Sequence, residues 1–181
     1  SNGRLLLAEA EGSIWRGSQK MFSATALNDV VINRAGRGGM IEVHVEHNDI
    51  FMYSQRADGL IITTPTGSSA YSLSAGGPLL HPGLDAVALV PVAPQTLSNR
   101  PIIIPGDGTL KLTLTGVGRG QTGANVHFDM QSWSDLQLGD CIQVQRAPWN
   151  IRFVHPQGYS YFSTLRRKLN WNRMPQNGEP N

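Results

Sequence analysis

Alternating apolar and polar residues run through most of this chain and predict β-strands. Residues 41–46 place Ile41, Val43 and Val45 on one face of a strand and three polar side chains on the other. Residues 110–115 alternate in the same way. Turn-forming residues recur about every ten positions, a spacing typical of β-sandwiches. The strands expected from the whole pattern are residues 3–10, 26–33, 40–47, 50–55, 60–64, 87–92, 102–104, 110–115, 126–128 and 142–145.

Helical patterns are few. A short helix is expected at residues 69–73, and another at residues 161–169, where apolar side chains recur on one helical face. Hairpin turns are expected at residues 48–49 and 106–109, and a flexible tail at residues 176–181. The predicted fold class is therefore mainly β: a β-sandwich with one or two short helices and a C-terminal helix.

The composition fits a single globular domain. Of the 181 residues, 40% are apolar and 15% are charged, and 20 glycines with 11 prolines make the chain rich in turns. The longest apolar run, residues 84–94, is interrupted by an aspartate and two prolines. Such a run is too short to cross a bilayer, so no membrane association is expected.

The distribution of charge and the cysteine content bear on which partners the chain binds and in which compartment it lies. The basic residues at 166–168 lie near the end of the expected C-terminal helix, where cations interact favourably with the helix dipole. They are therefore not taken as a nucleic-acid site. Cys141 is the single cysteine and cannot form an internal disulfide, which favours a reducing compartment and predicts a cytoplasmic location.

The densest chemistry lies in residues 58–78. Eight hydroxyl side chains occupy the twelve positions from residue 63 to residue 74, after an apolar strand and a Pro-Thr-Gly turn. A strand, a glycine turn and a helix start can point free N–H groups at an anion, and hydroxyls suit ribose and phosphate oxygens. A Ser/Thr-rich turn with ordinary helix caps would give the same composition. On composition alone, both interpretations stay open.

Residues 58–78 also resemble the signature of the NAD kinase family, in its substrate-binding C-terminal domain. Segments resembling other parts of that domain follow in the same order along the chain: residues 26–31, 96–101, 129–131 and 155–171. The resemblance implies that residues 1–175 are the β-sandwich C-terminal domain of an NAD kinase. It also implies that the family's N-terminal α/β domain is absent from this chain.

NAD kinases transfer the terminal phosphate of ATP, with a divalent metal such as Mg²⁺, to the adenosine-ribose 2′-hydroxyl of NAD, giving NADP. The resemblance implies that Asn28 and Asp29 bind the adenosine half of NAD, with the Asp29 carboxylate reaching ribose hydroxyls. It implies that Asp58 meets the nicotinamide carboxamide and that Arg56 contacts phosphate or ribose. The other NAD-binding residues implied are Thr66, Ser69, Ala70, Tyr71, Ser72, Leu73, Ser74 and Gln131, with Gly39 near the ligand.

The family's catalytic Gly-Gly-Asp-Gly-Thr loop belongs to the N-terminal domain. Residues 106–109 read Gly-Asp-Gly-Thr, but a proline precedes them and an alternating strand follows, which indicates a turn. We therefore expect no catalytic residue here and an isolated chain that does not phosphorylate NAD. We also expect no metal ligands, because His44 and His47, three apart in a strand, face opposite sides.

The resemblance further implies NAD, NADP and ATP as partners and a homodimer or homotetramer. Two other functions stay open: a lipid-kinase-related β-sandwich domain, and a non-catalytic nucleotide-binding or interaction module. The Thr-Pro-Thr-Gly-Ser-Ser-Ala-Tyr run at residues 64–71 favours a polar nucleotide over an acyl chain.

Overall fold

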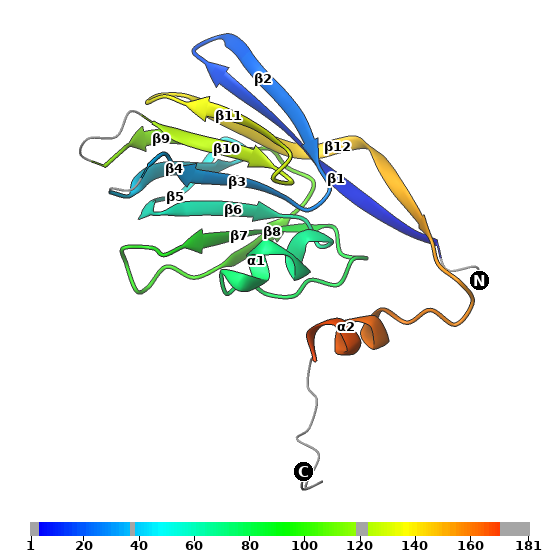
Figure 1. Ribbon diagram of the computed structural model, residues 1–181. Helices are drawn as coiled ribbons and strands as arrows, with labels where there is room; N and C mark the ends of the chain where they lie inside the picture. Colours follow the sequence, from blue (N-terminus) through cyan, green and yellow to red (C-terminus); the bar gives the residue numbers. More distant parts are fainter. Residues whose placement is uncertain (1–3, 37–38, 119–122, 171–181) are drawn as a thin grey trace, which may run out of the picture. The chain divides into compact units, whose positions relative to one another are not determined.

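The computed structural model describes residues 4–36, 39–118 and 123–170 (Figure 1). The tail expected at residues 176–181 lies outside this range. Among the described residues, those between 6 and 151 form one compact unit, and residues 4–5 with residues 152–170 form a second. The predicted β-sandwich is confirmed in the first unit, where two antiparallel sheets enclose the main core.

Each sheet has six strands in the described part of the chain. The first has the order β2 (Gln19–Ala26), β1 (Arg4–Arg16), β12 (Cys141–Val154), β9 (Leu110–Gly116), β4 (Ile41–His47) and β5 (Ile50–Ala57). The second has the order β11 (Ser132–Leu136), β10 (Ala124–Phe128), β3 (Asp29–Arg34), β6 (Gly59–Thr63), β7 (Ala86–Val92) and β8 (Ile102–Pro105).

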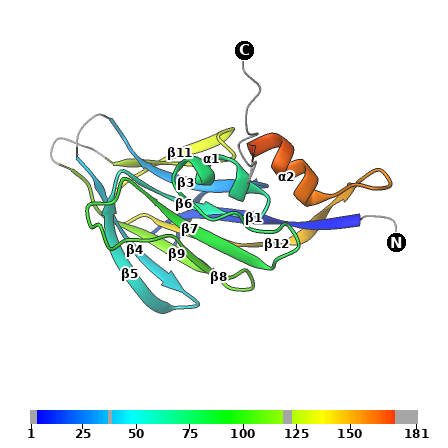
Figure 2. The same cartoon turned by 90° about the horizontal axis from the view of Figure 1, so that it is seen from below.

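The second sheet is buried on both faces at its centre. Val30 and Ile32 of β3 point into the main core, whereas Val31 packs on the opposite face with Ile61 and Leu80. The segment after β6, which contains a 3₁₀ turn (η1, Gly67–Ser69) and helix α1 (Tyr71–Ser74), lies on that outer face (Figure 2). Two-sided burial explains why β3 and β6 appear in the sequence as continuous apolar runs and not as alternating ones.

Two expectations about local structure are wrong. Ala70, with φ −101° and ψ −129°, separates η1 from α1, so the single helix expected at residues 69–73 is two short turns. Residues 106–109 do form a turn, but not a hairpin: β8 before it pairs with β7, and β9 after it pairs with β4 and β12. The turn therefore carries the chain from one sheet to the other.

The sequence pattern also missed β2 and β11. It predicted that the first strand ends at residue 10, whereas β1 continues to Arg16. β2 and β11 are edge strands whose residues are mostly exposed, so few apolar side chains mark them. By contrast, the hairpin at residues 48–49 is confirmed, because Ile50 pairs with His47 across it.

In the smaller unit, helix α2 (Tyr161–Leu169) has the bounds expected from the sequence. The Ser160 hydroxyl accepts from the Ser163 N–H at 3.3 Å and caps its start. Asn170, at φ 49°, ends it in the left-handed conformation, and the three basic residues lie in its last turn.

An ion pair fastens the end of β1 to the loop before β12. The Asp140 carboxylate is almost completely buried and accepts from Arg16 Nε and a terminal guanidinium nitrogen at 2.8 and 2.9 Å. It also accepts from the Gln137 N–H at 2.8 Å. The hydrogen bonds from Arg16 and Gln137 hold the pKa of Asp140 below its usual 3.8.

We expect Asp140→Ala to lower the free energy of unfolding at neutral pH by about 2 kcal/mol, because hydrogen bonds to the buried carboxylate are lost, whereas the Arg16 side chain is 41% exposed and can be solvated by water. Since the pKa is lowered on folding, this contribution is present above about pH 4 and is lost as the pH falls below that value. Urea unfolding of both proteins at about pH 7 and about pH 3 measures the difference. Asp135→Ala, at an exposed carboxylate of β11, is the control. Equal midpoints for wild type and Asp140→Ala at neutral pH would contradict the expectation.

Candidate functional site

Three segments that are distant in the sequence meet at one end of β3. They are the turn between β2 and β3 (residues 27–28), the turn after β6 (residues 64–67) and the turn between β10 and β11 (residues 129–131). Each contains positions singled out in the sequence. The fold thus brings Asn28, Asp29 and the start of the Ser/Thr-rich segment together.

The turn after β6 is bonded to the turn before β3 through the backbone and two threonine hydroxyls. The Thr64 N–H donates to the Asn28 carbonyl at 2.9 Å, and the Thr64 hydroxyl donates to the Leu27 carbonyl at 2.6 Å. The Thr63 hydroxyl also donates to the Asn28 carbonyl, at 3.2 Å. These bonds fix the start of the Ser/Thr-rich segment against Asn28.

Gly67 lies so close to Asn28 that a side chain does not fit. A Cβ atom placed on Gly67 would be 2.1 Å from the Asn28 carbonyl oxygen and 2.6 Å from its Cα. The glycine of the Pro-Thr-Gly turn is therefore required for close approach of two backbones and not for an unusual φ angle.

The hydroxyls of residues 63–74 divide into two groups. Ser68 and Ser72 are buried: the Ser68 hydroxyl bridges the Pro65 carbonyl at 2.7 Å and the Leu80 N–H at 2.9 Å, and Ser72 donates to the Ser68 carbonyl at 3.4 Å. Together with Thr63 and Thr64 they hold the segment in shape. The outward positions are Ser69, Ala70, Tyr71 and Ser74, which are exposed, and Thr66 and Leu73, which are half-buried. The buried hydroxyls therefore have a structural role, and the outward residues are the ones available to a ligand. Ser72, a predicted NAD-binding residue, belongs to the buried group.

The Ser68 hydroxyl is expected to be a main support of this segment. Ser68→Ala removes the group that links Pro65 to Leu80, and we expect the free energy of unfolding to fall by about 1 to 2 kcal/mol. Thermal unfolding followed by circular dichroism measures the effect, with the exposed neighbour Ser69→Ala as the matched control. A Ser68→Ala protein as stable as the control would show that the bridge contributes nothing.

Asp29 is the charged residue most affected by its surroundings at this junction. Its side chain is only 3% exposed, and it starts β3 opposite Thr63 of β6. Burial and, secondarily, the negative charge of Asp129 raise the pKa of Asp29 from 3.8 to about 6. The carboxylate therefore changes charge close to neutral pH, which is unusual for an aspartate.

The other predicted contacts lie at the far end of β6. Asp58 forms an ion pair with Arg34 at 3.3 Å, and Arg56 lies 4.0 Å from Glu42. Because a strand rises about 3.3 Å per residue, Asp58 is roughly 16 Å from Thr63. The structure therefore separates Arg56 and Asp58 from the Asn28–Asp29 junction by the length of one strand.

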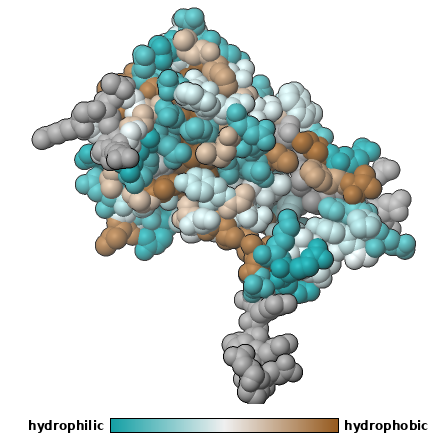
Figure 3. Space-filling model, viewed as in Figure 1, coloured by the Kyte–Doolittle hydropathy of each residue, from teal (hydrophilic) through white to brown (hydrophobic). Residues whose placement is uncertain are grey.

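Two further predicted residues are exposed. Gln131 lies in the turn between β10 and β11, next to the junction, and its N–H donates to the Phe128 carbonyl at 3.0 Å. Gly39, with φ 76°, lies in the loop between β3 and β4. Large apolar side chains are also exposed in this unit, including Tyr71, Met130 and Trp133. Figure 3 shows apolar residues scattered among hydrophilic ones on the face drawn there.

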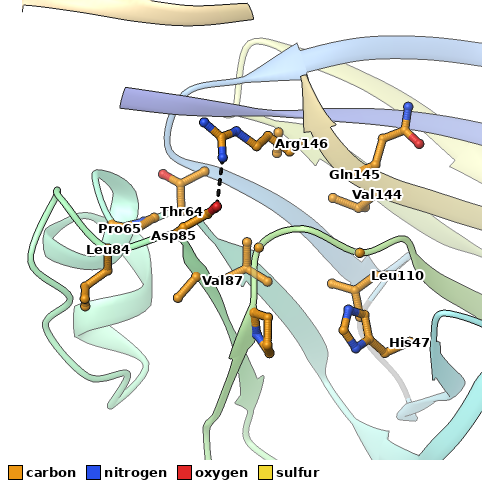
Figure 4. A pocket seen from close by; sticks show the side chains of 15 residues that line it. His47, Thr64, Pro65, Leu84, Asp85, Val87, Leu110, Val144, Gln145 and Arg146 are labelled. Atoms are coloured by element: carbon orange, nitrogen blue, oxygen red, sulfur yellow. Dashed lines mark hydrogen bonds and ion pairs between the residues drawn. The ribbon is translucent and has the colours of Figure 1, made fainter. Parts of the chain in front are cut away.

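A small cavity lies beside the turn after β6 (Figure 4). Arg146 and Asp85 form an ion pair at 2.9 Å on one side, and His47 and Leu110 lie on the other. Its volume is about 30 Å³, enough for about two water molecules. Of the junction residues it touches Thr64 and Pro65 only, so it does not coincide with the predicted NAD contacts.

In the part of the chain that the structure describes, no group of three or more His, Cys, Asp or Glu side chains is close enough to hold a metal ion. His44 instead hydrogen-bonds the Ser54 hydroxyl at 3.2 Å and stacks on Phe51. Among the same described residues, no helix is long and apolar enough to cross a membrane.

Asp129 lies in a segment that resembles the family, residues 129–131, but the sequence predicted no role for it, although its side chain organises the junction. The Asp129 carboxylate accepts from the N–H groups of Leu27, Asn28 and Asp29 at 2.7, 2.7 and 3.1 Å. One signal was available: an aspartate between a strand and a two-residue turn tolerates positive φ and bonds backbone N–H groups.

The chain is similar to known proteins of one family. The family model for the ATP-NAD kinase C-terminal domain matches residues 27–156. Over 173 residues the chain is 72% identical to an NAD kinase from Bordetella parapertussis, covering 96% of this chain and 57% of that protein. It is 51% identical over 169 residues to an NAD kinase from Paraburkholderia phytofirmans, covering 93% and 55%. The chain thus spans little more than half the length of these relatives.

Two solved structures share the fold. A crystal structure of yeast NADH kinase complexed with NADH has a TM-score of 0.91 and 23% identity, covering 98% of this chain and 53% of that one. A crystal structure of an NAD kinase from Archaeoglobus fulgidus in complex with ATP has a TM-score of 0.69 and 23% identity, covering 85% and 56%. With the match of the family model over most of its length, this chain belongs to the ATP-NAD kinase C-terminal domain family.

Proposed function

We propose that this chain is the NAD-binding part of an enzyme that phosphorylates the adenosine-ribose 2′-hydroxyl of NAD to give NADP. The observation that carries the proposal is the junction of Asn28 and Asp29 with the turn of residues 64–67. It brings the buried Asp29 and the half-buried Asn28 to the start of a segment whose outward residues carry hydroxyls, and these groups suit a ribose with two neighbouring hydroxyls. The relatives named NAD kinase support the same activity.

The roles proposed for individual residues combine the family resemblance with the exposure of each side chain. In this proposal Asp29 accepts from ribose hydroxyls, with Asn28 beside it, and the outward residues Thr66, Ser69, Ala70, Leu73 and Ser74 line the nucleotide. Tyr71 offers an exposed ring for stacking against a base. Gln131 borders the adenosine end, Asp58 meets the nicotinamide carboxamide, and Arg56 contacts phosphate or ribose. The buried Ser72 contributes through its backbone, because its hydroxyl is bonded inside the segment.

Phosphoryl transfer itself needs groups beyond those described here. The donor is proposed to be ATP, with Mg²⁺ bound to its phosphates, and the base that activates the 2′-hydroxyl is proposed to belong to an N-terminal domain. We also propose residues 1–175 as the C-terminal domain, a cytoplasmic location, and a homodimer or homotetramer of the complete enzyme.

Calorimetric titration of the 181-residue chain with NAD tests the proposal. We expect binding at micromolar to millimolar NAD, and about tenfold weaker binding for Tyr71→Ala, which removes the exposed ring. With ATP and Mg²⁺ added, the chain is expected to form no NADP. Ser18→Ala, in the exposed turn between β1 and β2, is the control.

Each result has a distinct meaning for the proposal. An absence of NAD binding at millimolar concentration would contradict a preformed site in this chain. Unchanged affinity in both Tyr71→Ala and Asp58→Asn would favour an interaction module. Turnover of NAD to NADP by the isolated chain would show that its base lies among these residues.

A further inference from the structure

Asp129 adopts a backbone conformation that brings its side chain back toward β3. Asp129 and Met130 both have positive φ angles, 50° and 58°, at the tip of the hairpin between β10 and β11. Two backbone bonds hold this tip: Gln131 N–H to the Phe128 carbonyl, and Asp129 N–H to the Asp29 carbonyl, both at 3.0 Å. Aspartate tolerates this conformation better than most residues.

The carboxylate of Asp129 fills an anion-binding nest made by its own chain. Three consecutive N–H groups, those of Leu27, Asn28 and Asp29, converge on its two oxygens at 2.7 to 3.1 Å. Such a row of N–H groups binds phosphate or carboxylate in many proteins. Here the Asp129 carboxylate already accepts from these three N–H groups, so they are not available to a ligand phosphate.

These bonds hold residues 27–29 from one side, and the turn after β6 holds them from the other. Thr64 bonds to the carbonyls of Leu27 and Asn28, and Gly67 packs directly on Asn28. The peptide planes at residues 27–29 are therefore fixed by donors on one side and acceptors on the other. Because the peptide planes set the Cα–Cβ directions, the side chains of Asn28 and Asp29 start from fixed positions.

Asp129 also acts on Asp29 through its charge. Asp29 lies on β3, Thr63 faces it from β6, and Asp129 faces it from the β10–β11 turn. In the described chain, Asp129 is the charged group that shifts the pKa of Asp29, adding to the effect of burial. A negative charge at this place disfavours ionisation of Asp29.

We propose that Asp129 is a positioning residue of the dinucleotide site, which orients Asn28 and Asp29 toward the ligand ribose. This inference rests on the proposed function and adds to it a residue that touches no ligand. It also makes recognition of the ribose dependent on pH: the ionised Asp29 accepts from both hydroxyls, whereas the protonated form accepts less well.

The test is the NAD affinity of the 181-residue chain between about pH 5 and pH 8, measured by calorimetry. In the wild type, affinity is expected to rise with pH, with a midpoint near the pKa of Asp29 of about 6. For Asp129→Asn we expect affinity about tenfold weaker and the midpoint at a lower pH, since the neighbouring charge is gone. Asp135→Asn makes the same charge change at an exposed site of the same hairpin and should alter neither quantity. A loss of affinity that is equal at every pH, with an unmoved midpoint, would overturn the inference.

A second variant keeps the test decisive if Asp129→Asn does not fold. Asp129→Glu retains the charge but misplaces the oxygens, so affinity should fall while the midpoint stays near that of the wild type. Wild-type affinity in Asp129→Glu would overturn the positioning role.

A measurement without NAD separates this inference from the proposed function. Carboxyl NMR titration of Asp29 should show a lower pKa in Asp129→Asn than in the wild type. If it does and neither protein binds NAD, the proposed function fails while the action of Asp129 on Asp29 stands. If the pKa of Asp29 is unchanged, the inference fails whether or not NAD binds.

Discussion

Gly67→Ala is expected to disrupt the candidate site more than any other single methyl group added to it. The new Cβ would lie 2.1 Å from the Asn28 carbonyl oxygen, and that oxygen accepts from Thr63 and Thr64. Because the neighbour is backbone, it cannot rotate away, and the turn after β6 must separate from the turn before β3. We expect the free energy of unfolding to fall by about 3 kcal/mol and NAD affinity to fall at least about tenfold. Urea unfolding and calorimetric titration measure the two effects.

Gly76 provides a matched control, because it needs glycine for a different reason. Its φ is +83° and nothing lies within 4 Å of a Cβ placed on it. Gly76→Ala should therefore cost about 1 to 2 kcal/mol from backbone strain alone, and Gly76→Asn less, since asparagine tolerates positive φ. At Gly67, asparagine should be no better tolerated than alanine. Wild-type stability and affinity in Gly67→Ala would show that the two turns can separate without loss.

The apolar pattern predicted the deeply buried strands of the sandwich and two of the four edge strands, β5 and β8, but missed the other two, β2 and β11. β6 is buried along its whole length, and its Leu-Ile-Ile run indicated a strand directly. β2 and β11 have one neighbour each and are largely exposed, so their side chains carry little apolar signal. The turn at residues 106–109 shows a related difficulty. Its glycines predict a turn, but nothing in those four residues encodes that β8 and β9 belong to different sheets.

The sequence indicated which segments meet at the junction but not the bonds that hold them. The resemblance of residues 58–78 to a known family directed attention to a segment whose start lies against Asn28 in the structure. Composition could not separate Ser68, whose hydroxyl is buried, from Ser69, which is exposed, because this depends on where the segment packs on the sheet. Asp129 lies about a hundred positions from the residues it holds, and its bonds depend on the register of β10 against β3. Such long-range contacts leave almost no pattern in a single sequence.

Because Asp29 is buried, its ionisation is expected to lower the stability of the fold while it strengthens the binding of NAD. Because folding raises the pKa of this carboxylate from 3.8 to about 6, the folded chain holds a proton that the unfolded chain releases between these values. Stability is therefore expected to fall as the pH rises from about 4 to about 6. Above that range the ionised Asp29 costs about 2 to 3 kcal/mol.

Asp29→Asn removes that charge while keeping the shape of the side chain. At about pH 7.5 the variant is expected to be more stable than the wild type by up to about 2 kcal/mol, and to bind NAD at least about tenfold more weakly, since a neutral amide cannot replace a carboxylate on two ribose hydroxyls. At about pH 3, where Asp29 is largely protonated in both the folded and the unfolded state, the gain in stability should vanish. Urea unfolding at the two pH values, with Asp135→Asn as the control for loss of an exposed charge, measures the change. A variant less stable than the wild type at neutral pH would contradict this expectation. It would show that the surroundings stabilise the ionised Asp29 carboxylate, so that keeping it charged for a ligand does not lower the stability of the fold.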